Sequence, residues 1–112
     1  MLQDYPSTGY SYSGYRGAAY ANKYVSQANS YFYEAGADCT NFVSQCIWAA
    51  YGGWNTSMSD TTMESNIRNK VRMTSSWYAG SGGGSSAWEN VDSLWNYAVG
   101  NNLRELVQGK ND

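Results

Sequence analysis

The segment from Asp38 to Ala50 constrains the fold more than any other part of the chain. Its apolar residues return every three or four positions, which is the spacing of one helix face: Cys39, Phe42, Val43, Cys46, Ile47 and Ala50. Asp38 fits an N-cap, because its carboxylate can accept the amide hydrogens of a first turn. Gly52-Gly53 should end the helix. The pattern predicts the most buried helix of the chain.

A second helix is predicted nearer the N-terminus. Residues 1–16 are rich in Tyr, Ser and Gly and are expected to form an irregular lead-in. A helical pattern opens at Arg16-Gly17 and should end at Asn29-Ser30 after about three turns. Its apolar stripe consists of Tyr20, Ala21, Tyr24, Val25 and Ala28.

The second half of the chain has weaker patterns. Three apolar residues four positions apart favour a helix within 54–73, although neighbouring Thr and Asn residues disfavour it, and 71–78 can equally form a short strand. Those three residues are Met63, Ile67 and Val71. Residues 81–85 predict a flexible turn. Ser86 and Glu89 have the spacing of a capping box, and the helix after it has an apolar face made of Trp88, Val91, Leu94, Trp95 and Ala98.

Composition excludes several classes of function. The net charge is -2 with no basic run, which argues against nucleic acid as a partner. No apolar stretch approaches the ~20 residues of a membrane span. The chain has 112 residues and no histidine, so a His-ligated metal site and a Cys-His pair cannot be completed within it, and two cysteines cannot make an all-thiolate zinc site. We expect no metal and no cofactor.

Cys39 is the candidate catalytic residue. It stands at the first position of the predicted buried helix, where free amide hydrogens and the helix dipole favour a thiolate. Its own N–H, at the helix start, can help to hold an oxyanion. The alternative is a buried helix-start cysteine without function. Cys46 lies roughly 10 Å away along a helix, too far for a disulfide, and is expected to be a core residue.

Four further residues are candidates for positioning the substrate or an oxyanion: Tyr33, Asp38, Asn41 and Gln45. Each has a structural alternative. Tyr33 can anchor its loop instead, Asp38 can serve only as an N-cap, and Asn41 and Gln45 can pack against the sheet that is expected outside these residues.

The aromatic residues divide into two groups by their predicted location. Trp48, Trp88 and Trp95 lie on helical stripes and are expected in the core. Trp54, Trp77 and Tyr78 lie nearer predicted loops, where an aromatic ring can stack on a sugar or a peptide.

The string Asp-Cys-Thr-Asn-Phe-Val-Ser-Gln-Cys at 38–46 resembles the putative amidase domain family of bacteria. Other matching blocks lie on both sides of it, at 15–16, 18–24, 31–32, 77–78, 86–88 and 91–97. The resemblance implies an α+β, papain-like cysteine hydrolase related to CHAP amidases and cell-wall cysteine peptidases. In that fold the nucleophile opens a helix, a position that Cys39 matches, and a small sheet supplies a histidine base. The implied substrate is an amide bond in a peptide or in peptidoglycan.

The missing histidine is a departure from the family. We therefore expect residues 1–112 to be the N-terminal part of a single domain, mostly its helical lobe with little sheet, and inefficient alone because general-base help is worth ~10²–10⁴-fold. A natural descendant without histidine is the alternative. An exposed sheet-facing surface would favour self-association. The expected location is extracellular or cell-wall associated, with any export signal outside this chain. A non-catalytic module that binds cell-wall or surface material is the other function considered.

Overall fold

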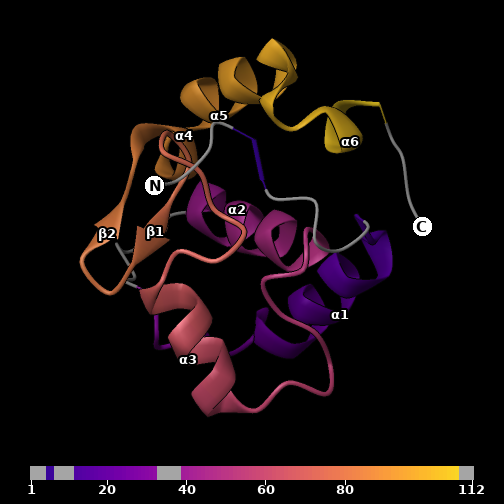
Figure 1. Ribbon diagram of the computed structural model, residues 1–112, viewed down its shortest axis with the longest axis vertical. Coiled ribbons are helices and arrows are strands. Elements are labelled where there is room, and N and C mark those ends of the chain that lie inside the picture. Colours follow the sequence, from indigo (N-terminus) through magenta and orange to yellow (C-terminus); the bar gives the residue numbers. More distant parts are fainter. Residues whose placement is uncertain (1–4, 7–11, 33–38, 109–112) are drawn as a thin grey trace.

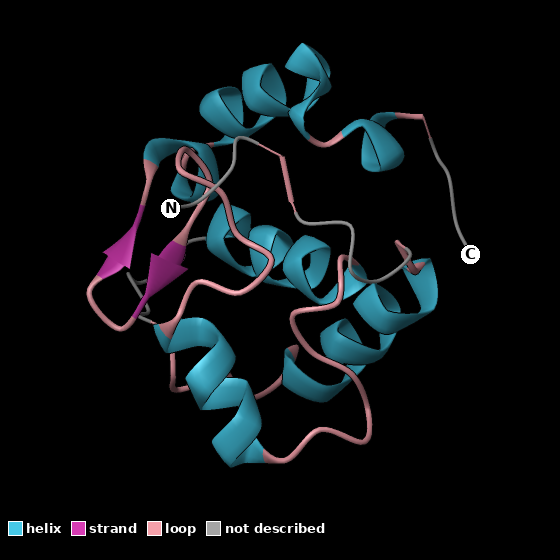
Figure 2. Cartoon of the chain, viewed as in Figure 1, coloured by secondary structure: helices cyan, strands magenta, loops and turns pink. Residues whose placement is uncertain are grey.

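The computed structural model describes residues 5–6, 12–32 and 39–108 of the chain (Figure 1). Five elements form the first part of the fold: α1 (Gly14–Tyr24), α2 (Cys39–Ala50), α3 (Asp60–Arg68), β1 (Ala79–Gly80) and β2 (Gly83–Gly84). The rest is α4 (Ser86–Glu89), α5 (Val91–Tyr97), a π-helical turn η1 (Ala98–Asn102) and α6 (Arg104–Val107). Figure 2 shows that helices dominate and that one small hairpin accompanies them. This mixture is compatible with the predicted α+β class.

Helix α2 lies across the middle of the molecule, with α1 packed beside it (Figure 1). The helices approach closely at Gly17, where a Cβ would lie 3.1 Å from the carbonyl oxygen of Cys46. Arg16 donates from Nη2 to the Ala50 carbonyl at 2.7 Å and from Nε to the Ala49 carbonyl at 3.2 Å. A cation on the last carbonyls of a helix satisfies them and complements the helix dipole. Arg16 therefore caps the C-terminal end of α2.

Helix α1 begins and ends earlier than the sequence predicted. Ser13 is its N-cap and accepts a hydrogen bond from the Arg16 amide at 3.2 Å, so the expected irregular lead-in to residue 16 was wrong for 14–16. The helix ends at Tyr24 instead of Asn29. Asn29 is buried, and its Oδ1 accepts from the Tyr31 amide at 3.0 Å, a local turn that competes with helix.

Helix α2 has the predicted bounds but a different buried face. It ends as expected, with Gly52 at φ 105° and the Gly53 amide donating to the Trp48 carbonyl at 3.0 Å. The face predicted to be buried is partly exposed to solvent, because Val43 and Cys39 are exposed. The buried residues of α2 are instead Asn41, Ser44, Gln45, Ile47, Trp48, Ala49 and Ala50.

The core is built mainly of aromatic rings. Phe32 packs edge-on to Trp48 at 5.3 Å between centroids, and Trp77 lies 4.6 Å from Trp88. Trp48 and Trp88 are core residues, as predicted. Trp54 is also buried, so neither it nor Trp77 is available to stack on a ligand, contrary to the expectation from their positions near loops.

Two predicted features of the second half are confirmed. Helix α3 forms with Met63 and Ile67 buried, and Ser59 caps it by accepting from the Thr62 amide at 3.1 Å. A turn also forms in the Gly-rich segment, at residues 81–82, whereas Gly83 and Gly84 form strand β2, with Ala79 opposite Gly84 and Gly80 opposite Gly83.

The helix expected to run on from Ser86 is broken in two. Asn90 has extended backbone angles (φ -114°, ψ 128°) and caps α5 by accepting from the Ser93 amide at 3.0 Å. Glu89 accepts from the Gly84 amide at 2.8 Å instead of closing a capping box on Ser86. The break changes the phase of the helix, so Trp88 is buried while Trp95, predicted to be in the core, is 65% exposed.

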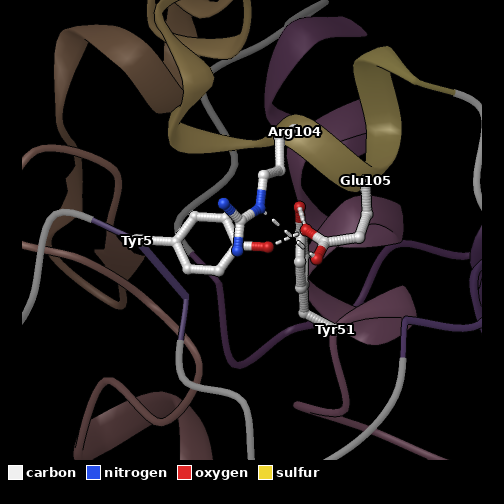
Figure 3. A network of polar contacts seen from close by, with 4 residues as sticks. All are labelled: Tyr5, Tyr51, Arg104 and Glu105. Atoms are coloured by element: carbon white, nitrogen blue, oxygen red, sulfur yellow. Dashed lines mark hydrogen bonds and ion pairs between the residues drawn. The ribbon is translucent and has the colours of Figure 1, made fainter.

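The two ends of the described chain meet beside the C-terminal end of α2. Tyr5 and Tyr51 both donate from their hydroxyls to Glu105 Oε1, the second at 3.2 Å (Figure 3). The guanidinium of Arg104 lies 4.9 Å from the centroid of the Tyr5 ring. These contacts hold α6 against the core.

Candidate active site at the start of helix α2

Cys39 is the first residue of α2, and its side chain is exposed. The intrahelical hydrogen bonds of any α-helix leave the first N–H groups without a partner one turn back. The first turn of α2 itself carries no acidic residue, and Asp38, directly before it, lies outside the described residues. The structure therefore places an accessible thiol where backbone dipoles favour an anion.

Two predicted site residues lie outside the described part of the chain. Asp38 and Tyr33 both belong to the segment 33–38 that the structure leaves undescribed. Their roles as N-cap, oxyanion donor or loop anchor stay predictions.

Asn41 and Gln45 lie on the inner face of α2 and not on its surface. Asn41 Oδ1 accepts from Trp88 Nε1 at 2.8 Å and from Gln45 Nε2 at 3.2 Å. Gln45 Oε1 accepts from the Tyr20 hydroxyl at 2.5 Å. Both side chains are buried. They hold α2 against α1 and α4, whereas the predicted structural role was packing against a sheet.

Ser44 is a residue that the sequence reasoning missed. Its hydroxyl donates to the Trp88 carbonyl at 2.9 Å and accepts from Trp77 Nε1 at 3.2 Å, and it is fully buried. A signal was present, because Asn41, Ser44, Gln45 and Trp48 also follow helical spacing. Because three of its members are polar, that stripe does not stand out in the sequence as a core face.

Cys46 differs from Cys39 in its surroundings. It is half-buried and forms no disulfide. Desolvation by burial raises the pKa of the Cys46 thiol to about 11. Cys46 is therefore almost entirely protonated at neutral pH and is a poor nucleophile.

The outer face of α2 lines an apolar groove. The groove has a volume of about 600 Å³ and lies between α1, α2, α5 and α6. Phe42, Val43 and Cys46 contribute from α2, Trp95 contributes from α5, and none of the described lining residues is charged. Cys39 stands three and four residues before Phe42 and Val43, so it shares their helix face. Cys39 itself is not among the residues that line the groove.

Two specific features are absent from the described residues. No group of three or more His, Cys, Asp or Glu residues in them could hold a metal ion. No helix in that part of the chain has the length and apolar content that a membrane crossing requires.

Comparison with known proteins gave one match. No curated protein and no solved structure matches the chain. The model of the family described as putative amidase domain matches residues 11–111, nearly the whole sequence and with it all of α2. The chain therefore belongs to the putative amidase domain family.

Proposed function

We propose that this domain cleaves amide bonds with Cys39 as its nucleophile. Membership of the family indicates amide hydrolysis. The observation that supports a cysteine mechanism is the position of Cys39, an exposed thiol at the first residue of the 12-residue helix α2. Cys46, which burial keeps protonated, is the poorer candidate.

The proposed chemistry has two stages. The Cys39 thiolate attacks the carbonyl carbon of the amide, and the oxyanion that forms accepts hydrogen bonds from N–H groups of the first turn, that of Cys39 among them. The tetrahedral species collapses to a thioester, and the amine leaves with a proton. Water then hydrolyses the thioester, which releases the acid and restores the thiol.

The base in this scheme comes from outside these residues. The thiol must lose a proton and the leaving amine must gain one, a role that histidine commonly fills. The 112 residues contain none. In the proposal, a papain-like fold is completed by a sheet that carries the base, and residues 1–112 form the N-terminal, largely helical part of that domain.

The proposed substrate is a peptide or the peptide part of peptidoglycan. This proposal is supported by the resemblance of the segment 38–46 to the putative amidase domain family, which implies a relation to cell-wall cysteine peptidases, and the low charge of the chain is compatible with a neutral polymer. The corresponding location is outside the cell or in its wall.

The alternative of a non-catalytic binding module loses the part of its support that tryptophan supplied. It depended on the abundance of Tyr, Trp, Asn, Ser and Gly as contact residues and on the low charge of the chain, which suits neutral glycans. Trp48, Trp54, Trp77 and Trp88 are all buried, which leaves Trp95 as the one exposed tryptophan of the described chain. The aromatic residues mostly build the core.

Acyl transfer from p-nitrophenyl acetate tests the proposal. Imidazole is added as an external base, and the acetylated residue is located by mass spectrometry. We expect one acetyl group on Cys39 in the wild type and in Cys46→Ser, and none on residue 39 in Cys39→Ala. Preferential acetylation of Cys46, or of surface lysines with Cys39 unmodified, would contradict the proposal.

A further inference from the structure

We propose that a buried chain of hydrogen bonds from Asn29 to Asn41 is a positioning device for Cys39, an inference that rests on the proposed role of Cys39 as nucleophile. Asn29 Nδ2 donates to the Tyr20 hydroxyl at 3.1 Å, and that hydroxyl donates to Gln45 Oε1 at 2.5 Å. Gln45 Nε2 donates to Asn41 Oδ1 at 3.2 Å, and Trp88 Nε1 donates to the same oxygen at 2.8 Å. We call these five residues the buried polar chain.

The hydrogen bonds of the buried polar chain all run toward Asn41. Each donor from Asn29 through Tyr20 and Gln45 points along the chain, and Trp88 closes it from the other side. Bonds in such a series polarise one another and strengthen the last acceptor contact. Asn41 Oδ1 is therefore held from two directions, by its own helix and by α4.

Stability alone does not account for this arrangement. All five side chains are buried in a core that is mainly aromatic and aliphatic, with few other polar residues such as Ser44 and Thr74. A buried hydrogen bond contributes little net stability, because the same groups are hydrogen-bonded to water in the unfolded chain, and apolar residues of similar shape can serve as well. What a fully satisfied polar network adds is a single fixed geometry.

That geometry acts on the first turn of α2. Asn41 is two residues beyond Cys39, so the contacts that fix Asn41 also fix the N–H groups beside the thiol. Through Tyr20 they connect this turn to α1, and through Trp88 to α4. Oxyanion donors act best when they are held in place before the reaction. The buried polar chain therefore orients the backbone that would support the Cys39 thiolate and the oxyanion.

Removal of one hydroxyl tests this inference. Tyr20→Phe deletes the central donor. Tyr24→Phe deletes a hydroxyl on the same helix whose bond goes to Met63 Sδ at 3.5 Å, an atom that also accepts from Asn29 Nδ2 at 3.3 Å, and it leaves the four hydrogen bonds of the buried polar chain in place. The readout is the rate of iodoacetamide alkylation of Cys39 between pH 6 and 9, with Cys46 as an internal reference. We expect Tyr20→Phe to slow the alkylation of Cys39 about two- to fivefold at pH 7 and to shift the dependence of that rate on pH toward higher pH. The reason is that weaker support from the helix start disfavours the thiolate. Tyr24→Phe should leave the profile of Cys39 unchanged.

The outcomes separate the two proposals. If Cys39 is no faster than Cys46 in the wild type, the role of Cys39 as nucleophile fails. If Cys39 is fast in the wild type and equally fast in Tyr20→Phe, the buried polar chain does not position it. If Tyr20→Phe unfolds the protein, the alkylation of Cys46 will speed up as well. In that case Gln45→Met takes its place, because it breaks the buried polar chain with a side chain of similar length, and the same outcomes apply.

Discussion

The Tyr20 hydroxyl of α1 donates a 2.5 Å hydrogen bond to Gln45 Oε1 of α2, in the middle of the core. Tyr20 has no exposed surface. Desolvation by burial raises the pKa of its hydroxyl well above the ordinary value of 10.0. The hydroxyl therefore stays protonated in the folded chain at any pH at which the protein is stable, and it keeps its role as a donor.

The raised pKa of Tyr20 predicts a loss of stability at alkaline pH. In the unfolded chain the hydroxyl ionises near pH 10, whereas in the folded chain it stays protonated, so above pH 10 the unfolded state binds fewer protons. The free energy of unfolding should then fall by up to ~1.4 kcal/mol per pH unit for this one group. Burial raises the pKa of Tyr51 as well, in the same sense. Urea unfolding at pH 8, 9, 10 and 11 measures the effect. A free energy that is constant up to pH 11 would contradict it.

Much of α1 and α2 could be predicted from the sequence, but the orientation of α2 could not. The length of α2, its end at Gly52-Gly53 and the location of Cys39 at its start follow from local signals. Apolar spacing pointed to Cys39, Phe42 and Val43 as the inner face, whereas polar residues with partners face the core. Polar residues become core residues when α1, α4 and the aromatic side chains supply hydrogen bonds, and those partners are distant in the sequence.

Truncation of a buried tryptophan should lower the free energy of unfolding far more than truncation of an exposed one. Trp88→Ala removes a fully buried ring together with its hydrogen bond to Asn41 and should cost about 3–5 kcal/mol of unfolding free energy. Trp95→Ala removes a mostly exposed ring and should cost less than about 1 kcal/mol. Urea denaturation at low protein concentration compares them. Similar losses of unfolding free energy in both variants would contradict the interruption between helices α4 and α5 at Asn90.

A local signal for that break existed in Asn90. Asparagine is a favoured N-cap, and Ser93 stands three residues after it, where its amide can donate to the cap. The Ser86–Glu89 capping-box pattern is the competing signal, and it predicts one longer helix because an uninterrupted apolar stripe follows it. The capping box does not form, because the Glu89 carboxylate accepts a hydrogen bond from the Gly84 amide of the hairpin.

Gly53 is expected to tolerate no side chain. A Cβ there would lie 2.1 Å from Cε2 and Nε1 of Trp48, whose ring is held by a 2.8 Å hydrogen bond from Nε1 to the Val71 carbonyl. Gly53→Ala should therefore destabilise the fold by roughly 1–3 kcal/mol or more. Gly82→Ala is the matched control, because no atom lies within 4 Å of its Cβ position, and it should change stability by less than about 0.5 kcal/mol. The melting temperatures of the two variants, measured by thermal unfolding, test this prediction. Equal melting temperatures would contradict the packing described for Trp48.

The apolar groove predicts that the chain associates with a second copy of itself. The groove and the exposed Trp95 at its edge belong to one surface, so two copies related by a two-fold axis can each insert a ring into the other. A stable dimer buries about 800 Å² per partner, roughly an eighth of the 6230 Å² surface of this chain. Sedimentation velocity should show a dimer that Trp95→Asp dissociates and that Val25→Asp, an exposed position away from the groove, leaves intact. A monomer at all concentrations would contradict the prediction.

The most direct test of the central claim is the alkylation rate of each cysteine by iodoacetamide at pH 7, measured by peptide mass spectrometry in the folded chain and in urea. Unfolding removes both the helix start and the burial, so each thiol serves as its own reference. If Cys39 is an activated nucleophile, it reacts faster folded than unfolded, while Cys46, whose thiol has a pKa of about 11 in the fold, reacts more slowly folded than unfolded. A Cys39 that reacts no faster in the folded chain than in urea would contradict the account.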